Sequence, residues 1–315
     1  MSGERYCRSL TAPLTAHRFL PHAVKLFPMR NLTRRRLLSV TLGAATAAVA
    51  GDALLVEPTE IKVTHHDVPV PELPPALEGL RIGCLTDVHL YHNISAAARA
   101  ALEHLHRERP EVVVLIGDIC NSRDDLANLA AWARQARGSA ATFATLGNWE
   151  HDAGIDRLTG ERVYDRAGVE LLYNSTGRVT VGGATLAVVG IDDPVLGEPD
   201  LPTALAGVRA GDVSTWVMHG PGYVDTVPRQ TAPKPAVILA GHTHGGQIRL
   251  PFYTPYTPVG SGRFVAGWYR DTVAPLYVSR GIGTVLVPAR LFCPPELPVF
   301  TLRRGPPHDD PRVPA

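Results

Sequence analysis

The chain has 315 residues, of which 45% are apolar, 19% charged and 6% aromatic. This composition suits one large α/β domain with a substantial buried core. Residues 1–36 hold eight of the 31 lysines and arginines but only one of the 30 acidic residues. Residues 51–315 are left with 23 basic and 29 acidic side chains, a balance of −6. A mildly acidic body offers no basic surface to a nucleic-acid backbone, so no nucleic-acid partner is expected.

The cysteine content argues against a disulfide framework. Cys7 lies in the N-terminal segment, and the other three cysteines are an odd number with no Cys-x-x-Cys spacing. Cys84 and Cys120 lie within apolar runs. We therefore expect both to be buried free thiols.

Residues 1–50 are predicted to form an N-terminal leader. Thr33-Arg34-Arg35-Arg36-Leu37-Leu38 precedes the uncharged stretch Ser39–Ala50, which ends in small residues. A basic region, a short apolar region and small residues are typical of a secretory signal. Paired arginines followed by Leu-Leu resemble a twin-arginine signal. The sequence thus predicts a protein that engages the twin-arginine export machinery and works in the periplasm or cell envelope.

Two further interpretations of the leader stay open. The uncharged stretch is shorter than the ~20 residues of a spanning helix, and Asp52 interrupts it. If Leu54, Leu55 and Val56 join it, the leader serves as an uncleaved membrane anchor. An ordinary amphipathic N-terminus is the other interpretation. Met29 stands four residues before the motif, so residues 1–28 are candidates for an over-extended start.

The body, residues 51–303, alternates apolar strands with helices, and the proline-containing tail, residues 304–315, is predicted to be disordered. Ile61–Val70 reads as an edge strand that leads into a proline-rich connector, Pro69–Pro75. Further strands are predicted over Leu80–Leu85, Val112–Ile116, Thr142–Leu146, Thr215–Met218 and Val237–Ala240, and helices over Ser95–His106 and Asp124–Ala136. A hairpin is predicted over Val179–Val181 and Leu186–Val189. Late antiparallel strands are predicted over Leu276–Ser279, Gly283–Val287 and Val299–Leu302. The pattern indicates one α/β domain with two sheets packed face to face.

Polar residues follow five of the predicted strands at the point where each strand ends. They are Asp87 with His89, Asp118, Asn148, His219, and His242 with His244. Ligands of open α/β sheets bind outside the carboxyl ends of the strands, so we expect these five segments to converge. Each i, i+2 pair leaves an extended chain on one face, which lets the pair converge on one site.

The residue types indicate metal ions. Seven ligands are too many for one tetrahedral ion, but they fit two ions that share Asp118 at a spacing of ~3.5–4 Å. Imidazole suits zinc, iron or manganese, and carboxylate or amide oxygen suits the harder of these ions. Glycines beside Asp118, Asn148 and His242 allow tight turns and close backbone approach. Most of these motifs are common in turns, whereas two histidines in the glycine-rich loop Gly241–Gly246 have no good structural explanation.

The ordered set Leu85-Thr-Asp-Val-His89, Gly117-Asp118, Gly147-Asn148, His219 and Gly241-His-Thr-His-Gly245 resembles the calcineurin-like metallophosphoesterase family from about residue 60 to residue 303. The resemblance implies a four-layer α/β/β/α sandwich with two face-to-face mixed β-sheets. It also implies the ligand groups: Asp87, His89 and His244 for one ion, Asn148, His219 and His242 for the other, and Asp118 bridging. The segment Gly281–Glu296, after a twin-arginine leader, looks like the exported, membrane-associated bacterial branch.

The chain departs from the family pattern at Trp149. The family usually has a histidine there, which stabilises or protonates the departing oxygen. Tryptophan donates one N–H but cannot carry a proton through the reaction. His151 lies two residues further on and is the candidate substitute, with a solvated histidine at a helix start as the alternative.

The predicted function is a metal-dependent phosphoesterase in which Asp87, Asp118, Asn148, His151 and Arg290 take part in catalysis. Two divalent ions make hydroxide available near neutral pH for in-line attack on phosphorus. Arg290 is the candidate supporting cation, with a surface salt bridge as the alternative.

Because Trp149 is a weak general acid, we expect diesters and pyrophosphates with good leaving groups. The leader and the acidic body motivate a small-molecule or lipid substrate that is acted on near the membrane. Two other functions are considered: a catalytically weak metal- or phosphate-binding protein, motivated by Trp149, and a nuclease or cyclic-nucleotide phosphodiesterase. The acidic body argues against a polynucleotide substrate.

Overall fold

The computed structural model describes residues 34–306, and the chain divides into two compact units, residues 1–45 and 46–315. The described residues of the first unit, 34–45, belong to helix α1 (Arg34–Gly51). The helix continues as a π-helical segment, Asp52–Val56, and a 3-10 turn, Glu57–Thr59. Thr33, the alternative start at Met29, Cys7 and the tail from residue 307 lie outside the described residues.

The apolar N-terminal helix is longer than the sequence pattern predicted. Arg34–Thr59 is a helical segment of 26 residues, long and apolar enough to cross a membrane. Leu54, Leu55 and Val56 join it because the backbone changes to π-helical hydrogen bonding at Asp52 and does not end there. A signal sequence near the N-terminus meets the same criteria of length and composition. The helix therefore fits both a signal and an anchor.

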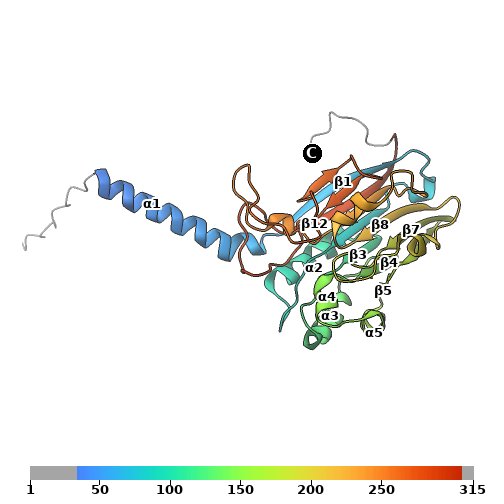
Figure 1. Ribbon diagram of the computed structural model, residues 1–315, viewed down its shortest axis with the longest axis horizontal. Helices are drawn as coiled ribbons and strands as arrows, with labels where there is room; N and C mark the ends of the chain where they lie inside the picture. Colours follow the sequence, from blue (N-terminus) through green and yellow to red (C-terminus); the bar gives the residue numbers. More distant parts are fainter. Residues whose placement is uncertain (1–33, 307–315) are drawn as a thin grey trace, which may run out of the picture. The chain divides into compact units, whose positions relative to one another are not determined.

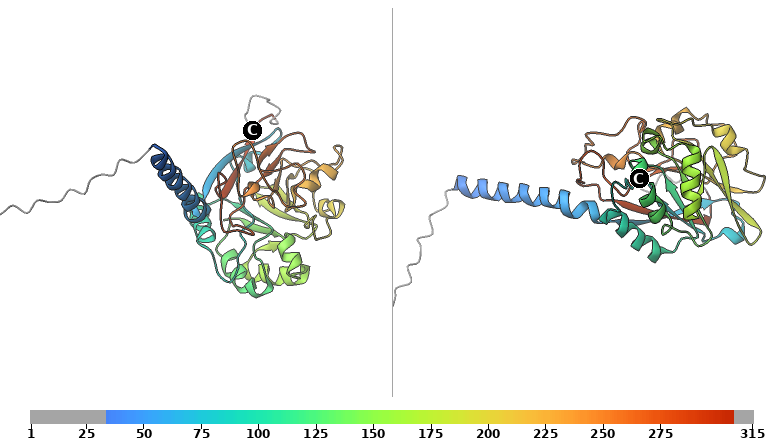
Figure 2. Two further views of the ribbon diagram at one scale, coloured as in Figure 1. Left: turned by 60° about the vertical axis from the view of Figure 1, so that its left-hand side comes forward. Right: turned by 90° about the horizontal axis from the view of Figure 1, so that it is seen from below.

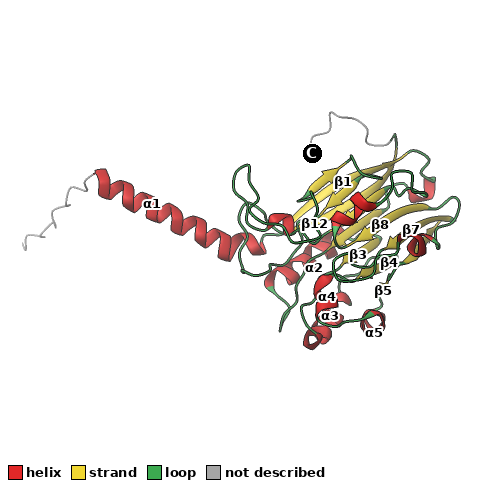
Figure 3. Cartoon of the chain, in the orientation of Figure 1, coloured by secondary structure: helices red, strands yellow, loops and turns green. Residues whose placement is uncertain are grey.

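Two six-stranded mixed sheets form the body of the protein (Figures 1 and 3). The strands of the first sheet are β1 (Lys62–Val70), β2 (Arg81–Leu85), β3 (Val112–Ile116), β4 (Ala141–Thr145), β5 (Glu170–Leu171) and β12 (Glu296–Arg304), in the order β1-β12-β2-β3-β4-β5. Those of the second sheet are β6 (Ser175–Val181), β7 (Ala184–Gly190), β8 (Val213–Met218), β9 (Val237–Ala240), β10 (Gly267–Tyr269) and β11 (Leu276–Val278), in the order β10-β11-β9-β8-β7-β6.

Strand pairing corrects the prediction for the last strands. β1 is an edge strand, as predicted, but β12 pairs with it in parallel and with β2 antiparallel. β11 pairs with β9 in parallel and with β10 antiparallel. Residues 283–287, predicted as a strand, form a loop. The Gln247 side chain bonds the N–H of Val285 and the carbonyls of Val285 and Val287, which occupies groups that a sheet ladder would need.

Helices cover the outer faces of both sheets (Figures 2 and 3). α2 (Ala96–Glu108), α3 (Leu126–Ala133) and α5 (Arg157–Ala167) share one core with the first sheet. α6 (Leu201–Leu205) and the 3-10 helix Pro221–Thr226 cover the second sheet. α4 (Asn148–Asp152) follows β4 directly. Short 3-10 turns occur at Pro75–Leu77, Arg123–Asp125 and His244–Gly246.

The predicted helices agree with α2 and α3 in place but not in every boundary. Ser95 caps α2 by accepting the Ala98 N–H, as its N-cap position predicts. α3 is shorter than the predicted Asp124–Ala136 because a 3-10 turn precedes it. The pattern did not predict α5 or α6.

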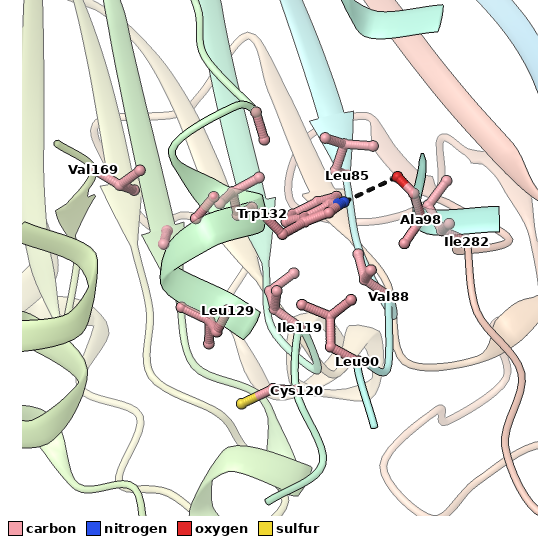
Figure 4. Close-up of a cluster of buried hydrophobic side chains, with 14 of the residues drawn as sticks. Leu85, Val88, Leu90, Ala98, Ile119, Cys120, Leu129, Trp132, Val169 and Ile282 are labelled. Carbon is pink, nitrogen blue, oxygen red and sulfur yellow. Dashed lines mark hydrogen bonds between the residues drawn. The ribbon is translucent and has the colours of Figure 1, made fainter. Parts of the chain in front are cut away.

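Successive side chains of a strand point to opposite faces of the sheet, which explains how each sheet packs against a layer on both sides. In β3, Val112, Val114 and Ile116 face the core between the sheets, whereas Val113 and Leu115 face the helices. Both faces are buried, so the strand reads as a continuous apolar run. Figure 4 shows the helix-side core, where the buried Trp132 indole donates to the Ala98 carbonyl at 2.9 Å. Cys84, Cys120 and Cys293 are buried free thiols, which confirms the prediction for the first two.

The four-layer α/β/β/α sandwich is confirmed. The layer over the second sheet is the thinner one, since its α-helix has only five residues. β2, β3 and β4 run parallel in one sheet and β7, β8 and β9 in the other. This arrangement brings the carboxyl ends of each parallel set to one edge, and side-chain contacts between the sheets show that the two edges meet.

Candidate metal centre

Two buried groups of potential metal ligands lie at these strand ends. Asp87, His89 and His244 form one group, and Asp118, His219 and His242 form the other. Within each group, one ligand atom from every residue lies within 4.8 Å of the others. Six of the seven residues that the resemblance implied fall in these groups, and Asp118 falls in the second of them. All six side chains are buried.

Asp118 lies between the two groups. Its Oδ2 is 3.0 Å from His219 Nε2 and 3.8 Å from His89 Nε2, which belong to different groups. His89 Nε2 and His244 Nε2 are 3.0 Å apart, and His244 Nε2 is 3.5 Å from Asp87 Oδ1. His242 Nδ1 is 3.2 Å from His219 Nε2. The nitrogen and oxygen lone pairs thus converge on a shared space, as a bridging carboxylate requires.

Outer hydrogen bonds fix the tautomers of three histidines. His89 Nδ1 lies 2.7 Å from Asn121 Oδ1, His219 Nδ1 lies 3.0 Å from the Ile116 carbonyl, and His242 Nε2 lies 2.8 Å from the Val259 carbonyl. Because oxygen accepts in each contact, these nitrogens carry the proton. The opposite nitrogen of each ring is then available as a ligand, which is the usual arrangement behind metal-binding histidines.

The backbone of five ligand residues is left-handed, not extended. The φ values are 54° at Asp87, 50° at His89, 52° at Asp118, 72° at His242 and 51° at His244. Such conformations are costly for non-glycine residues and cluster at functional sites. The i, i+2 argument from extended geometry was therefore wrong in its mechanism: Asp87 and His89 share a group, but His242 and His244 divide between the two.

Glycines allow the loops to approach one another, as predicted. A Cβ on Gly147 would lie 2.3 Å from Asp118 Oδ1. A Cβ on Gly117, whose φ is +64°, would lie 2.7 Å from His219 Nδ1. Neither position accepts a larger residue without moving a ligand.

The buried charges are balanced inside the site. Burial opposes the charged form of Asp118, but His219, His89 and the Trp149 N–H lower the pKa of its carboxyl to about 2. Asp87 accepts the His242 N–H at 3.0 Å and the Thr86 hydroxyl at 2.6 Å. The Asp118 carboxyl is therefore held ionised, the form that binds cations.

Asn148 supplies a second indication that the site fits cations. Its side-chain Oδ1 is buried and has no hydrogen-bond partner. A buried acceptor without a donor is costly unless something else satisfies it. The next residue, Trp149, donates its backbone N–H to Asp118 Oδ1 at 2.9 Å, which fixes this loop on the bridging carboxylate. The nitrogen and oxygen donors fit divalent ions.

Trp149 and His151 occupy different environments. The Trp149 ring packs edge-on against His89, with the ring centroids 5.4 Å apart. His151 Nε2 is 2.8 Å from Asp192 Oδ1, a buried carboxylate that follows β7. Burial opposes the charged imidazole, but Asp192 raises the pKa of His151 above its usual value. Position 149 is thus beside the ligands, and His151 forms a partly buried ion pair.

Arg290 is buried in a structural role. Its guanidinium donates to the carbonyls of Gly283, Cys293 and Arg280 at distances of 2.6 to 3.1 Å. These contacts hold the 280–293 loop against the site. The surface salt bridge considered as the alternative does not match this buried position.

Sequence reasoning missed several supporting residues. The buried Glu150 carboxylate accepts the N–H groups of Gly147, Asp118, Ile119 and Cys120, so it joins two ligand loops. Asp192 and Asp193 follow β7 at the edge that carries the ligands. The signal used for the other five strands, an apolar run followed closely by a polar side chain of metal-ligand type, is also present there. Glu150 gave no such signal because its partners depend on the folded loops.

Comparison with known proteins identifies the family. The model of the calcineurin-like phosphoesterase family matches residues 80–246, which contain all seven proposed metal ligands. The chain belongs to this family. It is a metal-dependent phosphoester hydrolase, and its two ligand groups indicate a dinuclear site.

Individual relatives extend over almost the whole chain. An uncharacterized metallophosphoesterase, YkuE of Bacillus subtilis, is 29% identical over 87% of this chain and 99% of its own length. The phosphodiesterase YaeI of Escherichia coli is 28% identical over 86% of this chain and 99% of its own length. A zebrafish (Danio rerio) transmembrane protein with a metallophosphoesterase domain is 27% identical over 86% of this chain but only 63% of its own length.

Proposed function

We propose that this protein hydrolyses phosphodiester or pyrophosphate bonds whose leaving groups are good, in a small-molecule or lipid substrate near a membrane. The observation that carries the proposal is Trp149, a residue without a transferable proton, packed against the ligand His89. With no imidazole at this position, the departing oxygen must leave with its own charge or take a proton from elsewhere.

The proposed ligands are Asp87, His89 and His244 for one ion and Asn148, His219 and His242 for the other, with Asp118 shared. When bound, two divalent ions such as manganese, zinc or iron lower the pKa of water and stabilise charge on phosphoryl oxygens. The chain holds the ligands in place through the outer hydrogen bonds of His89, His219 and His242. Arg290 is then a positioning residue, since its guanidinium is bonded to three carbonyls.

The test is the dependence of rate on the leaving group. kcat/KM is measured for aryl and alkyl phosphodiesters of graded leaving-group acidity, with manganese present, for the wild type, Trp149→His and His151→Ala. The wild type should show a steep dependence. Trp149→His should raise the rate mainly on poor leaving groups, by up to the ~10²–10⁴ that a positioned acid contributes.

The same series separates the alternatives. A flat dependence that steepens in His151→Ala would assign the acid to His151. A flat dependence that neither substitution changes would contradict this account of Trp149. A metal-loaded wild type that turns over no diester or pyrophosphate would favour the weak binding protein instead.

Export and membrane association are part of the proposal. The arginines Arg34–Arg36 before an apolar helix support a twin-arginine signal, and relatives named as transmembrane proteins support a membrane location. The export machinery and a membrane-near substrate are the partners that this location implies.

A further inference from the structure

Large apolar side chains are exposed on the loops beside the metal centre. Of the eleven large apolar side chains exposed within residues 60–306, eight lie between Leu250 and Phe292. We call these eight the apolar rim: Leu250, Phe252, Tyr253, Tyr256, Val259, Leu286, Val287 and Phe292. Phe252 and Val259 are the most exposed of them, at 109% and 86%, followed by Leu286 at 82%. Apolar surface concentrated in this way marks a site of contact with a protein or a membrane.

Three rim residues hold their side chains outward at a conformational cost. The φ values of Phe252, Leu286 and Phe292 are 67°, 62° and 52°. Bulky residues disfavour this left-handed region, and it persists where the surrounding structure imposes it. The exposure of these side chains is therefore a built feature of the loops, which indicates a function for the rim.

The loops that carry the rim are hydrogen-bonded to the loop that carries the ligands His242 and His244. The Leu291 N–H donates to the Gln247 carbonyl at 3.0 Å, and the Gln247 amide donates to the carbonyls of Val285 and Val287 at 3.0 Å. These bonds join the two rim loops. The Val259 carbonyl accepts the proton of His242 Nε2. The rim and the candidate metal centre are thus one connected structure.

A cavity of about 220 Å³ opens between the rim and the centre. His244 forms part of its wall, together with Ile248, Tyr256, Pro258, Val285 and Leu286. The accessible wall is almost wholly apolar. The volume is below the ~300–1,000 Å³ typical of sites for whole small molecules, and it suits a hydrocarbon chain. A chain in this cavity would have its polar end beside a metal ligand.

The end of the long apolar helix is fixed to the same loop. The Arg290 N–H donates to the Ala53 carbonyl at 2.9 Å, and the Glu57 carboxylate accepts the N–H groups of Phe292, at 3.0 Å, and Cys293. Leu54, Leu55 and Val56, which lie in the chain between these two contacts, are exposed, as Phe292 is. If this helix crosses a bilayer, its end and the rim lie at the same membrane surface. This connection favours a bilayer over a protein partner as the occupant of the rim.

We propose that the apolar rim lies in the surface of a lipid bilayer and that the cavity beside His244 binds the hydrocarbon chain of a membrane lipid whose phosphoester reaches the metal centre. The inference rests on the proposed function and narrows its substrate class to phosphoesters with a long alkyl chain. Arg34–Arg36, at the other end of the helix, agree with an orientation in which the body lies outside the cytoplasm.

The position of the rim can be measured without catalysis. The full chain, with Cys7→Ser, is reconstituted in vesicles of phosphatidylethanolamine and phosphatidylglycerol and spin-labelled at Phe252→Cys, Leu286→Cys or, as a control, Leu158→Cys. The remaining cysteines are buried, and Leu158 is an exposed residue of α5. Spin labels at positions 252 and 286 should be more accessible to oxygen dissolved in the lipid than to a water-soluble nickel chelate. The label at position 158 should show the opposite preference.

Either of two results would overturn the membrane contact. One is that labels at 252 and 286 are as accessible to nickel as the label at 158. The other is that both reagents are excluded while two copies of the chain cross-link through the rim, which would make it a protein interface.

The cavity is tested with alkyl p-nitrophenyl phosphodiesters whose alkyl chains have from two to fourteen carbons. kcat/KM should rise with chain length, by up to about fourfold per buried methylene, until the cavity is filled. Leu286→Asp and Val285→Trp should flatten this rise, whereas Leu158→Asp should leave the ratio of long-chain to short-chain kcat/KM unchanged.

The outcomes separate this inference from the proposed function. If the wild type hydrolyses substrates of every alkyl-chain length equally and the spin labels at 252 and 286 are exposed to water, the phosphodiesterase activity stands and the lipid substrate is overturned. If the spin labels lie in lipid but the protein hydrolyses no diester, the phosphodiesterase function is overturned and the membrane contact is supported.

Discussion

At the scale of single residues, Asp118 links the two halves of the candidate centre. Its Oδ2 contacts a histidine of each ligand group, and its Oδ1 accepts the Trp149 N–H. A buried charge is costly unless it is paired, and here the two imidazoles and the Trp149 N–H keep the Asp118 carboxyl ionised. The charged carboxylate is therefore available to bind cations.

Asp118→Asn should be the most damaging conservative substitution, because it keeps the shape of the side chain and removes the shared negative charge. Metal content after manganese reconstitution should fall from two ions per chain to one or none. kcat/KM for a chromogenic diester should fall by more than the ~10–100-fold typical of losing an outer partner of a ligand. Elemental analysis and turnover measure both effects.

Asp200→Asn is the matched control, since Asp200 caps α6 at the surface. It should keep the metal content and turnover of the wild type. If Asp118→Asn does the same, Asp118 does not bridge the ions.

At the scale of elements, an ion pair fastens α4 to the end of β7. His151 of α4 bonds Asp192, which also accepts the Glu198 N–H at 2.7 Å. Burial opposes both charges, but the pair raises the pKa of His151 above 6.5 and lowers that of Asp192 below 3.8. The two shifts define the pH range in which the contact stabilises the fold.

His151→Gln should lower the free energy of unfolding by about 1.5–3 kcal/mol, the usual contribution of a hydrogen bond to a charged group. The raised pKa of His151 means that its contribution is complete below pH 6.5 and is lost as the pH rises through the raised value. The contribution of Asp192 is present above pH 3.8 and is lost as the pH falls through its lowered pKa. Denaturant unfolding at a series of pH values should therefore show the largest difference in between.

His65→Gln provides the control for this pair. His65 also contacts a carboxylate, Glu108, at 2.9 Å, but its side chain is 60% exposed. An exposed pair contributes little, so this substitution should change stability by less than about 1 kcal/mol at any pH. A His151→Gln effect that is equally small, or constant with pH, would mean that the ion pair does not fasten α4.

At the scale of the whole molecule, the proposed role of the N-terminal segment is to direct the enzyme out of the cytoplasm. Arg34→Lys with Arg35→Lys should leave the protein in the cytoplasm, because a receptor reads the arginine pair and not charge alone. Arg36→Lys keeps the pair and should be exported. Fractionation with immunodetection measures the outcome, and unchanged export of the double variant would contradict the twin-arginine interpretation.

N-terminal sequencing of the mature protein tests whether the N-terminal helix is retained as a membrane anchor. A mature chain that starts at Gly51 would lack Arg34–Ala50 and could not be anchored by the helix. The contacts of Ala53 and Glu57 with the 290–293 loop would survive such cleavage.

The sequence by itself determined the layers and the identity of the proposed ligands. Apolar runs such as Val112–Ile116 mark strands buried on both faces, because burial on both sides removes the alternation of a half-exposed strand. Polar residues directly after such strands mark the ligand edge, because parallel strands end on the same side. Both signals are local in the chain, so they survive without knowledge of the fold. The same rule would have found Asp192 and Asp193 had it been applied to β7.

Only the tertiary structure decided the contacts that orient and support these residues. His242 and His244 enter different groups although Asp87 and His89, with the same spacing and a left-handed backbone as well, share one. The tautomer of His242 depends on Val259, and the end of the helix is fixed through Ala53 to Arg290. The apolar rim likewise gathers residues from separate loops, because Gln247 joins them. Such contacts join positions far apart in the chain, and no local pattern of side chains specifies them.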